Sequence, residues 1–276
     1  MIDKMLNIFL LAIFSGAFAY LSFRKFEWAV LLIIFLLPSY LIRFDILGLP
    51  LTLLEVMILI VFSVWVFKNR QGLFLNIKSN LRGRRESARY PFDWEIVFLL
   101  FVSFAAIIVA GLSNDAFGIW KAYFFEPILL FLIILNTFKG FSGLRKILWS
   151  LAASVFFISI LAIYQKITGN LISNPSWAQE ETRRVVSFFG YPNAVGLFLA
   201  PLVIVFIGWL AQEIKNKITV LNYGLKISRV MAIIAIIFLA IASIFFAKSE
   251  GALIGVAAGS FVFLLLHRKL KWLALI

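Results

Sequence analysis

Long apolar stretches recur along this chain at short intervals, and they restrict its possible folds more than any other feature. Nine stretches of about 16–20 residues can be drawn, at residues 5–23, 27–42, 51–67, 94–111, 119–138, 146–165, 193–211, 230–247 and 251–266. Another begins at Trp272. Runs such as 233–239 show no alternation of polar residues, so helices fit better than barrel strands. We therefore predict an all-α transmembrane bundle of about nine complete spans plus the start of a tenth.

The composition agrees with a lipid environment. Hydrophobic residues make up 63% of the chain and charged residues 14%, against roughly 45–50% and 25% in typical soluble domains. The absence of cysteine excludes disulfides, thiolate nucleophiles and cysteine metal sites. The net charge is +13, but the sequence contains no recognisable nucleic-acid-binding fold, so this charge does not indicate binding to nucleic acid. We expect a single transmembrane domain over residues 1–276, with the lipid bilayer as a partner and no nucleic acid.

The distribution of basic residues predicts the orientation of the bundle. With nine crossings the loops fall alternately on two sides, and nineteen of the 26 lysines and arginines collect on one side. They lie in segments 24–25, 68–89, 139–146, 215–229 and 268–271. By the positive-inside rule this side is cytoplasmic and the N-terminus lies outside. The pattern is typical of a multi-pass protein of the inner (plasma) membrane.

Two alternatives concern the ends and loops of this arrangement. Residues 1–19 also resemble a signal peptide, in which Ala17-Phe18-Ala19 would be the cleavage site. Cleavage there would invert every later loop and place nineteen basic residues outside. The longest cytoplasmic loop, at about 68–93, either binds anionic lipid headgroups or a partner, or only fixes the orientation. The shortest apolar stretch has Pro38 near its end, which predicts a kink or a tilted entry.

The outside loop at about 166–193 carries the strongest candidate for a binding site. Arg183 and Arg184 are adjacent on the side that is otherwise poor in basic residues. A guanidinium group binds phosphate or carboxylate oxygens at two points and stays charged, so a pyrophosphate at the membrane surface is a suitable ligand. The same arginines equally fit a solvated loop helix in which they pair with Glu180 and Glu181.

A tight turn joins the last two complete helices on the same side. It contains Lys248 and Glu250, and charges near membrane depth are often functional, although snorkelling to the interface also explains a lysine. Behind them Gly251, Gly255 and Gly259 recur at every fourth residue, which predicts a small-residue face for helix packing.

Other polar positions give weaker signals. Gln165 ends a helix on the outside, and Lys121 and Glu126 lie near the outside end of another, where we interpret them as interfacial anchors. Asn193, after Tyr191 and Pro192, is expected to cap the following helix. The one histidine, His267, is placed at a cytoplasmic helix end. The sequence contains no metal-ligand spacing, nucleotide-binding loop or nucleophile elbow.

The sequence resembles a known family, the O-antigen ligase and O-antigen polymerase superfamily of polytopic bacterial membrane glycosyltransferases. The resemblance rests on Arg183-Arg184 followed by Phe188-Phe189-Gly190-Tyr191-Pro192-Asn193-Ala194-Val195-Gly196 entering a helix. The segments Tyr164-Gln165 and Lys248-Ser249-Glu250-Gly251-Ala252 also fit family positions. The resemblance covers most of the chain in the arrangement of the predicted spans, and a smaller part of the chain in matching sequence motifs.

The resemblance implies that the protein transfers or polymerises a polyprenyl-pyrophosphate-linked glycan at the outer face of the inner membrane, in cell-surface polysaccharide synthesis. The hydroxyl of a glycan or lipid acceptor would attack the anomeric carbon and pyrophosphate would leave. Such a site needs positive charge and a base, with no metal or other cofactor. The resemblance assigns the pyrophosphate to Arg183, Arg184 and Lys248. Either Arg183 or Arg184 matches the phosphate-binding arginine of the family, and we expect one of the two to face the site because adjacent helix positions diverge by about 100°. It assigns supporting positions to Gln165, Tyr191, Asn193 and Glu250.

The sequence departs from the family pattern in two places. The second family arginine follows a serine in the tight turn, where this chain has Glu250, and Lys248 would substitute for it in part. The family histidine that acts in catalysis lies on a later outside loop, which these 276 residues do not include. No catalytic residue is therefore assigned, and the chain is expected to be a fragment, a truncated product or a divergent relative. The alternative is a non-enzymatic membrane protein that binds or transports a polyprenyl-linked substrate.

Overall fold

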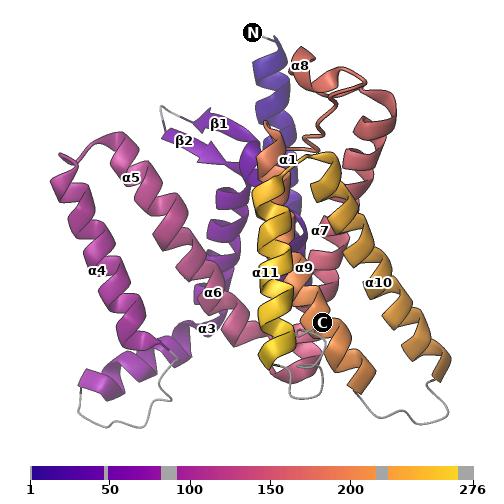
Figure 1. Ribbon diagram of the computed structural model, residues 1–276. Helices are drawn as coiled ribbons and strands as arrows, with labels where there is room; N and C mark the ends of the chain where they lie inside the picture. Colours follow the sequence, from indigo (N-terminus) through magenta and orange to yellow (C-terminus); the bar gives the residue numbers. More distant parts are fainter. Residues whose placement is uncertain (1, 47–48, 82–91, 216–222, 267–276) are drawn as a thin grey trace. The chain divides into compact units, whose positions relative to one another are not determined.

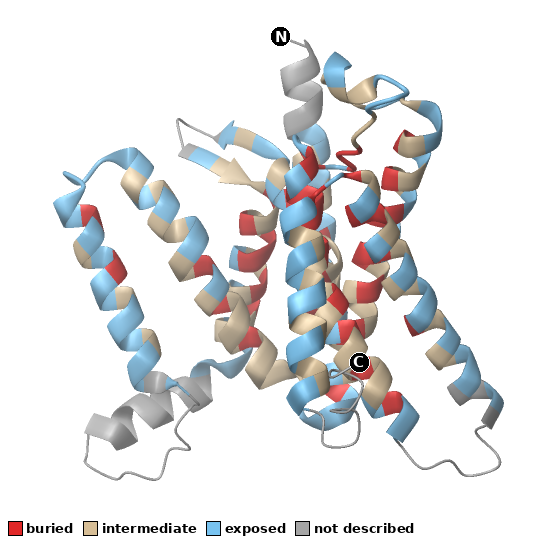
Figure 2. Ribbon diagram, in the orientation of Figure 1, coloured by how far each residue is buried: buried red, intermediate tan, exposed pale blue. Residues whose placement is uncertain are grey.

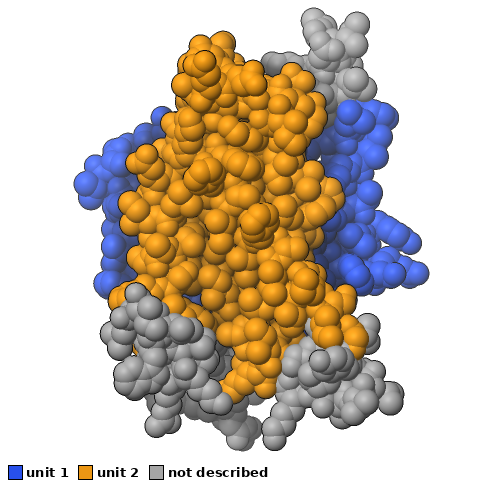
Figure 3. All heavy atoms as spheres, turned by 45° about the vertical axis from the view of Figure 1, so that its right-hand side comes forward, with its two compact units in different colours: residues 1–147 blue, residues 148–276 orange. Residues whose placement is uncertain are grey.

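The protein is predominantly helical in the computed structural model, which describes residues 2–46, 49–81, 92–215 and 223–266 (Figure 1). It divides into two compact units, residues 1–147 and 148–276 (Figure 3). The boundary falls within one long helix, α7 (Gly140–Thr168). The expected helical fold is confirmed in these ranges, with the addition of one short hairpin.

The elements of unit 1 follow one another with short connections. In chain order they are α1 (Ile2–Arg24), α2 (Phe26–Phe35), the 3-10 helix η1 (Leu37–Leu41), strands β1 (Arg43–Ile46) and β2 (Leu49–Thr52), α3 (Leu53–Leu81), α4 (Asp93–Val109), α5 (Asn114–Trp120), the π-helix η2 (Lys121–Phe125) and α6 (Glu126–Thr137). Helices α1, α2 and α3 pack on one another, and α6 packs on α3.

Unit 2 is a smaller set of helices around α9. After α7 come α8 (Pro175–Ala178), α9 (Pro192–Lys215), α10 (Tyr223–Phe246) and α11 (Glu250–Leu266). Helix α9 packs against both α10 and α11, and it buries apolar side chains along its length, Phe206 and Leu199 among them.

Each of the nine predicted apolar stretches coincides with a helical segment, with differences at their ends. Helix α2 stops at Phe35 and the chain continues as the 3-10 helix η1, which contains Pro38. Helix α3 continues to Leu81, so the first part of the predicted basic loop is helical. The rest of that loop up to residue 91, the stretch beginning at Trp272 and His267 lie outside the described residues.

The exposed faces of the helices indicate a lipid bilayer. Four helical runs among the described residues are long and apolar enough to cross a membrane, at Asn114–Thr137, Gly140–Thr168, Pro192–Lys215 and Ile227–Phe246. Large apolar side chains cover the exposed faces that are pale blue in Figure 2; Phe101 and Phe238, for example, are 72% and 71% exposed. Water penalises apolar surface this extensive, whereas lipid tails do not.

The hairpin of β1 and β2 was not predicted. Arg43 pairs with Thr52 and Ile46 pairs with Leu49 in an antiparallel register. The polar–apolar alternation of residues 43–46 has the period of a strand, but four residues are too few to distinguish a strand from a turn between two spans.

Helices α5 and α6 are joined through η2 into one continuous run. Pro127 has no N–H to donate to the carbonyl of Tyr123, and its ring would crowd that carbonyl in a regular helix. The N–H of Glu126 donates instead to the carbonyl of Lys121, five residues earlier. The proline therefore explains why a π turn, a feature frequent at functional sites, occurs at this point.

Candidate anion-binding site

The turn between α10 and α11 is closed by a left-handed residue. Lys248 has φ +49°, a region that residues other than glycine rarely adopt. Its N–H donates to the carbonyl of Phe245 at 2.9 Å, and the N–H of Ser249 donates to the carbonyl of Ile244 at 3.3 Å. This is the pattern that terminates many helices, and it allows α11 to begin at Glu250 directly after α10 ends.

Arg184 is held against this turn by three hydrogen bonds. Its Nε donates to the carbonyl of Ala247 at 3.1 Å, and its Nη2 donates to the carbonyl of Lys248 at 3.3 Å and to Oδ1 of Asn193 at 3.0 Å. The guanidinium thus satisfies carbonyls at the C-terminal end of α10, where positive charge is favourable. A guanidinium has five N–H donors, so Arg184 keeps donors for a ligand.

Arg183 points to a different helix end. Its Nη1 donates to the carbonyls of Lys166 at 2.8 Å and Ile167 at 3.2 Å, in the last turn of α7, and its Nε donates to the carbonyl of Ala178 at 3.2 Å. A Cβ atom on Gly169 would lie 2.8 Å from its Nη2. Arg183 therefore closes the C-terminus of α7 and ties it to α8.

The two arginines bond to different helix ends in a segment that is not helical. A loop helix was one of the two predicted arrangements. Residues 182–186 are not helical, and both guanidinium groups bond to the partners described above rather than to Glu180 and Glu181, which are exposed. The predicted helical ion pairs are thus not formed in this part of the structure.

Gln165 positions the segment that carries the arginines. The side chain is fully buried, at 0% exposure. Its Oε1 accepts from the N–H groups of Val186 at 2.9 Å and Ser187 at 2.7 Å, and its Nε2 donates to the carbonyls of Leu171 and Ser187, each at 3.0 Å. This amide therefore connects the end of α7 to both parts of the linker that leads to α9.

Close contact between α9 and α11 depends on Gly196. A Cβ atom at this position would lie 2.4 Å from Oγ of Ser249 and 2.6 Å from Cβ of Ala252. No larger residue fits without movement of one helix. The glycine therefore allows the first turns of the two helices to meet.

The predicted glycine face of α11 is only partly a packing face. A Cβ atom on Gly259 would lie 3.0 Å from Cδ1 of Ile204 on α9, whereas none would meet an atom within 4 Å at Gly251 or Gly255. Those two glycines line a cavity instead. Packing explains one of the three positions.

The first turns of α9 and α11 border a cavity of about 730 Å³. Polar side chains from the linker, from α9 and from the tight turn line it, together with small and apolar residues of both helices. The lining residues are Arg184, Asn193, Gly196, Leu197, Ala200, Pro201, Lys248, Ser249, Glu250, Gly251, Ala252 and Gly255.

The polar part of this cavity favours an anion. Arg184 and Lys248 contribute two positive charges and Glu250 one negative charge. Residues in the first turns of α9 and α11 line it too, and helix N-termini offer unpaired N–H groups and a partial positive charge. Two cations and two helix N-termini together suit a phosphate or carboxylate.

A second, smaller cavity of about 250 Å³ lies in the same unit. Its lining contains Lys166, Arg183, Phe245, Phe246, Lys248, Glu250 and Leu253. Lys248 and Glu250 border both cavities, while the guanidinium of Arg183 is occupied by carbonyls of α7 and of the linker.

Four of the predicted site residues meet at the larger cavity. They are Arg184, Asn193, Lys248 and Glu250. Asn193 is the second residue of α9, which begins at Pro192, so the prediction that it caps this helix is wrong, and its side chain accepts a hydrogen bond from Arg184 instead.

Tyr191 is exposed and is not among the lining residues of either described cavity.

Two serines near the site, Ser187 and Ser249, were not predicted from the sequence as site residues. Ser187 is buried with φ +50°, and its Oγ donates to the carbonyl of Ile158 at 2.7 Å. Ser249 is buried between α9 and α11. A single serine in a sequence does not indicate whether its side chain will be buried or which groups it will contact.

Metal-binding side chains do not gather in the described part of the chain: no three His, Asp or Glu residues there form a group that could hold an ion.

In comparisons with known proteins, no family model matches the chain, and neither a curated protein nor a solved structure matches it.

Proposed function

We propose that the cavity between α9 and α11 binds the pyrophosphate of a polyprenyl-linked glycan. One observation carries this proposal: two cations and two helix N-termini border the same cavity. The rest of the lining is small and apolar, through Leu197, Ala200 and Pro201, which suits the first units of an isoprenoid chain. The ligand would thus combine a charged head with an apolar tail.

In this proposal the protein is an O-antigen ligase- or polymerase-like glycosyltransferase of cell-surface polysaccharide synthesis. An acceptor hydroxyl forms a bond to the anomeric carbon while the bond to pyrophosphate breaks. Negative charge grows on the leaving oxygen, and donors already in place stabilise it without reorganisation. Arg184 suits this role because its hydrogen bonds to Ala247 and Asn193 fix the guanidinium in advance.

The reaction also releases a proton from the acceptor hydroxyl. Glu250 is the carboxylate that lines the cavity, and we assign it as the acceptor of this proton. A positioned carboxylate contributes through general-base catalysis once the hydroxyl lies within hydrogen-bonding reach. Substitution by glutamine tests the assignment because it keeps the shape and removes the basic oxygen.

The finer membrane arrangement belongs to the same proposal. We place nine spans across the inner membrane with the N-terminus outside, because nineteen of the 26 basic residues then lie in the cytoplasm. The tight turn of Lys248 and the linker of Arg184 would then face the outer leaflet, where a lipid-linked glycan is presented.

Binding or transport of a polyprenyl-linked substrate without transfer is the second candidate. The described lining of the cavity contains no histidine, although the family resemblance implies one in catalysis. This candidate predicts the same dependence of binding on Arg184 but no glycan product.

Glycan transfer by the purified protein in lipid nanodiscs tests the two candidates. A fluorescent oligosaccharide on polyprenyl pyrophosphate is incubated with an acceptor, and products are separated by electrophoresis. We expect transfer by the wild type, a loss of tenfold or more in Arg184→Ala and in Glu250→Gln, and no change in Arg43→Ala on the exposed hairpin. Unchanged transfer in Arg184→Ala would refute the site, and binding without any transfer would favour the second candidate.

A further inference from the structure

The smaller cavity contains a cation that the proposed pyrophosphate site does not use. Lys166, in the last turn of α7, lines this cavity but not the larger one. The cavity volume of about 250 Å³ corresponds to roughly eight water molecules at about 30 Å³ each, which is room for one sugar residue. Every residue of its lining belongs to unit 2.

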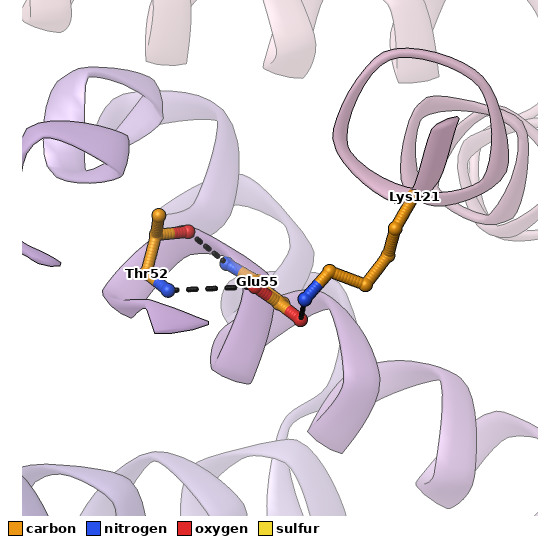
Figure 4. A network of polar contacts seen from close by, with 3 residues as sticks. All are labelled: Thr52, Glu55 and Lys121. Carbon is orange, nitrogen blue, oxygen red and sulfur yellow. Dashed lines mark hydrogen bonds and ion pairs between the residues drawn. The ribbon is translucent and has the colours of Figure 1, made fainter. Parts of the chain in front are cut away.

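The ammonium group of Lys166 is available to a ligand. In unit 1, by contrast, Nζ of Lys121 lies 2.5 Å from Oε1 of Glu55 (Figure 4). Nζ of Lys166 forms neither an ion pair nor a hydrogen bond with the residues that the structure describes. It lies 6.0 Å from the centre of the Phe246 ring, at cation–π distance. A half-buried ammonium group without a carboxylate partner is a suitable position for an anion.

Lys248 supplies a second ammonium group to the same cavity. The residue is exposed, and its side chain likewise has no hydrogen bond or ion pair within the described ranges. Carbonyls at the ends of α7 and α10 are already bonded to Arg183 and Arg184. Neither ammonium group is therefore needed to compensate the negative ends of these helices, and both lysines keep their charge for a ligand.

The lining combines this positive charge with aromatic rings. It contains three cations, of which Arg183 bonds to carbonyls, and one carboxylate, that of Glu250. An anionic group is thus favoured over a neutral one. Phe245 and Phe246 add apolar surface, on which the C–H face of a sugar ring can pack. A sugar residue that bears a carboxylate or a phosphate group fits both properties.

The two cavities meet at the tight turn between α10 and α11. Lys248 and Glu250 line both of them. Glu250 is the residue to which we assigned the proton of the acceptor hydroxyl, and a base of this kind must lie within reach of that hydroxyl. A sugar in the smaller cavity and a pyrophosphate in the larger one would both lie next to this carboxylate.

We propose that the smaller cavity binds an anionic sugar residue of the glycan acceptor, with the acidic group on Lys166 and Lys248 and a hydroxyl group at Glu250. This inference rests on the proposed function. The hydroxyl oxygen forms a bond to the anomeric carbon of the donor, and its proton goes to Glu250. Pyrophosphate leaves with the electron pair of the broken C–O bond.

An anionic lipid headgroup is the other ligand that carries an oxyanion to a membrane surface. The position of Glu250 favours the sugar, because a lipid site has no need of a carboxylate shared with the larger cavity. The sugar also explains why the aromatic rings and the ammonium groups line one small space. The experiment below separates the two sources of the oxyanion.

Sugar binding to the full chain in phosphatidylcholine nanodiscs tests this site. The protein is titrated with methyl glucuronide and, in parallel, with the neutral methyl glucoside, and binding is followed by saturation-transfer NMR. We expect the glucuronide to bind about tenfold more tightly than the glucoside. Lys166→Gln should remove most of this preference, and Lys166→Arg should retain it, because arginine keeps the charge.

The matched control is Lys139→Gln, which changes an exposed lysine directly before the other end of α7 and outside the cavity. It should leave the preference for the glucuronide unchanged. Equal affinities of the wild type for the two sugars, or an equal loss in Lys166→Gln and Lys139→Gln, would overturn the proposal. If Lys166→Gln folds poorly, loss of the preference in Lys166→Arg would overturn it as well.

Two further arms separate this inference from its alternatives. In phosphatidylglycerol nanodiscs the glucuronide should still bind; its displacement there, together with binding of glycerol phosphate in place of the sugar, would overturn the sugar site in favour of a lipid headgroup. The proposed function is judged by a different readout, since glycan transfer and pyrophosphate binding depend on Arg184, which does not line the smaller cavity. Glucuronide binding without any transfer would refute the acceptor role and leave the sugar site standing.

Discussion

Nη2 of Arg184 donates to Oδ1 of Asn193 at 3.0 Å, and this bond joins the linker between α8 and α9 to the first turn of α9. The same guanidinium bonds to the carbonyls of Ala247 and Lys248 at the end of α10. One side chain thereby fixes three segments around the larger cavity. An arginine suits this position because its planar fork can make these bonds and retain donors.

Arg183 should matter for stability more than for ligand binding. Arg183→Ala removes three hydrogen bonds to carbonyls at the end of α7 and in the linker, at a cost of about 1–3 kcal/mol. Thermal unfolding followed by tryptophan fluorescence should show a lower Tm than in Arg43→Ala, which changes an exposed arginine. Equal Tm values for the two variants would contradict the assigned role.

Gln165→Leu should be among the most destabilising single substitutions in unit 2. Leucine has nearly the same size but leaves the N–H groups of Val186 and Ser187 and the carbonyl of Leu171 without their partner. The expected loss is on the order of 3–5 kcal/mol. Denaturant unfolding in mixed micelles measures it, and the exposed Gln179→Leu serves as control, with a change below about 0.5 kcal/mol.

Two glycine substitutions should have opposite effects. Gly196→Ala places a methyl group 2.4 Å from Oγ of Ser249, which separates α9 and α11 and costs about 1–3 kcal/mol. Gly255→Ala meets no atom within 4 Å and should stabilise α11 by about 0.5–1 kcal/mol, because alanine favours the helix. Unfolding measurements on the pair check both signs; destabilisation by Gly255→Ala would show that α11 is packed more tightly than described.

Lys248→Gly should separate stability from binding. Glycine adopts the left-handed conformation of this residue without steric cost, so we expect stabilisation by about 1 kcal/mol. The same change removes a positive charge from the larger cavity and should weaken pyrophosphate binding. Lys248→Gln provides the control, since it loses the charge but keeps the strain. A decrease in Tm for the glycine variant would contradict the claim that the backbone of Lys248 is strained.

The sequence predicted the helices well because apolar residues in lipid must form them. The hairpin of residues 43–52 could not be predicted with the same security, because four-residue strands give little periodicity. The π turn at Lys121–Phe125 was likewise not predicted, although Pro127 was visible as a possible cause.

The residues of the candidate site were recognised as charges in unusual places, and Arg184, Lys248 and Glu250 do border one cavity. The sequence could not assign different partners to Arg183 and Arg184, because these partners are carbonyls at the ends of two different helices, α7 and α10. It also could not reveal the contact between Gly196 and Ser249, which are far apart in the chain. Lys121 was interpreted as an interfacial anchor, since nothing in the sequence places Glu55 beside it.

Equilibrium binding of a short-chain polyprenyl pyrophosphate is the most direct measurement of the proposed site. The full chain in nanodiscs is titrated with the pyrophosphate and, in parallel, with the corresponding polyprenyl alcohol. We predict that Arg184→Ala raises the Kd for the pyrophosphate by about tenfold or more, that Arg43→Ala leaves it unchanged, and that the alcohol binds much more weakly. Equal Kd values for wild type and Arg184→Ala, or equal binding of alcohol and pyrophosphate, would contradict an anion site at Arg184.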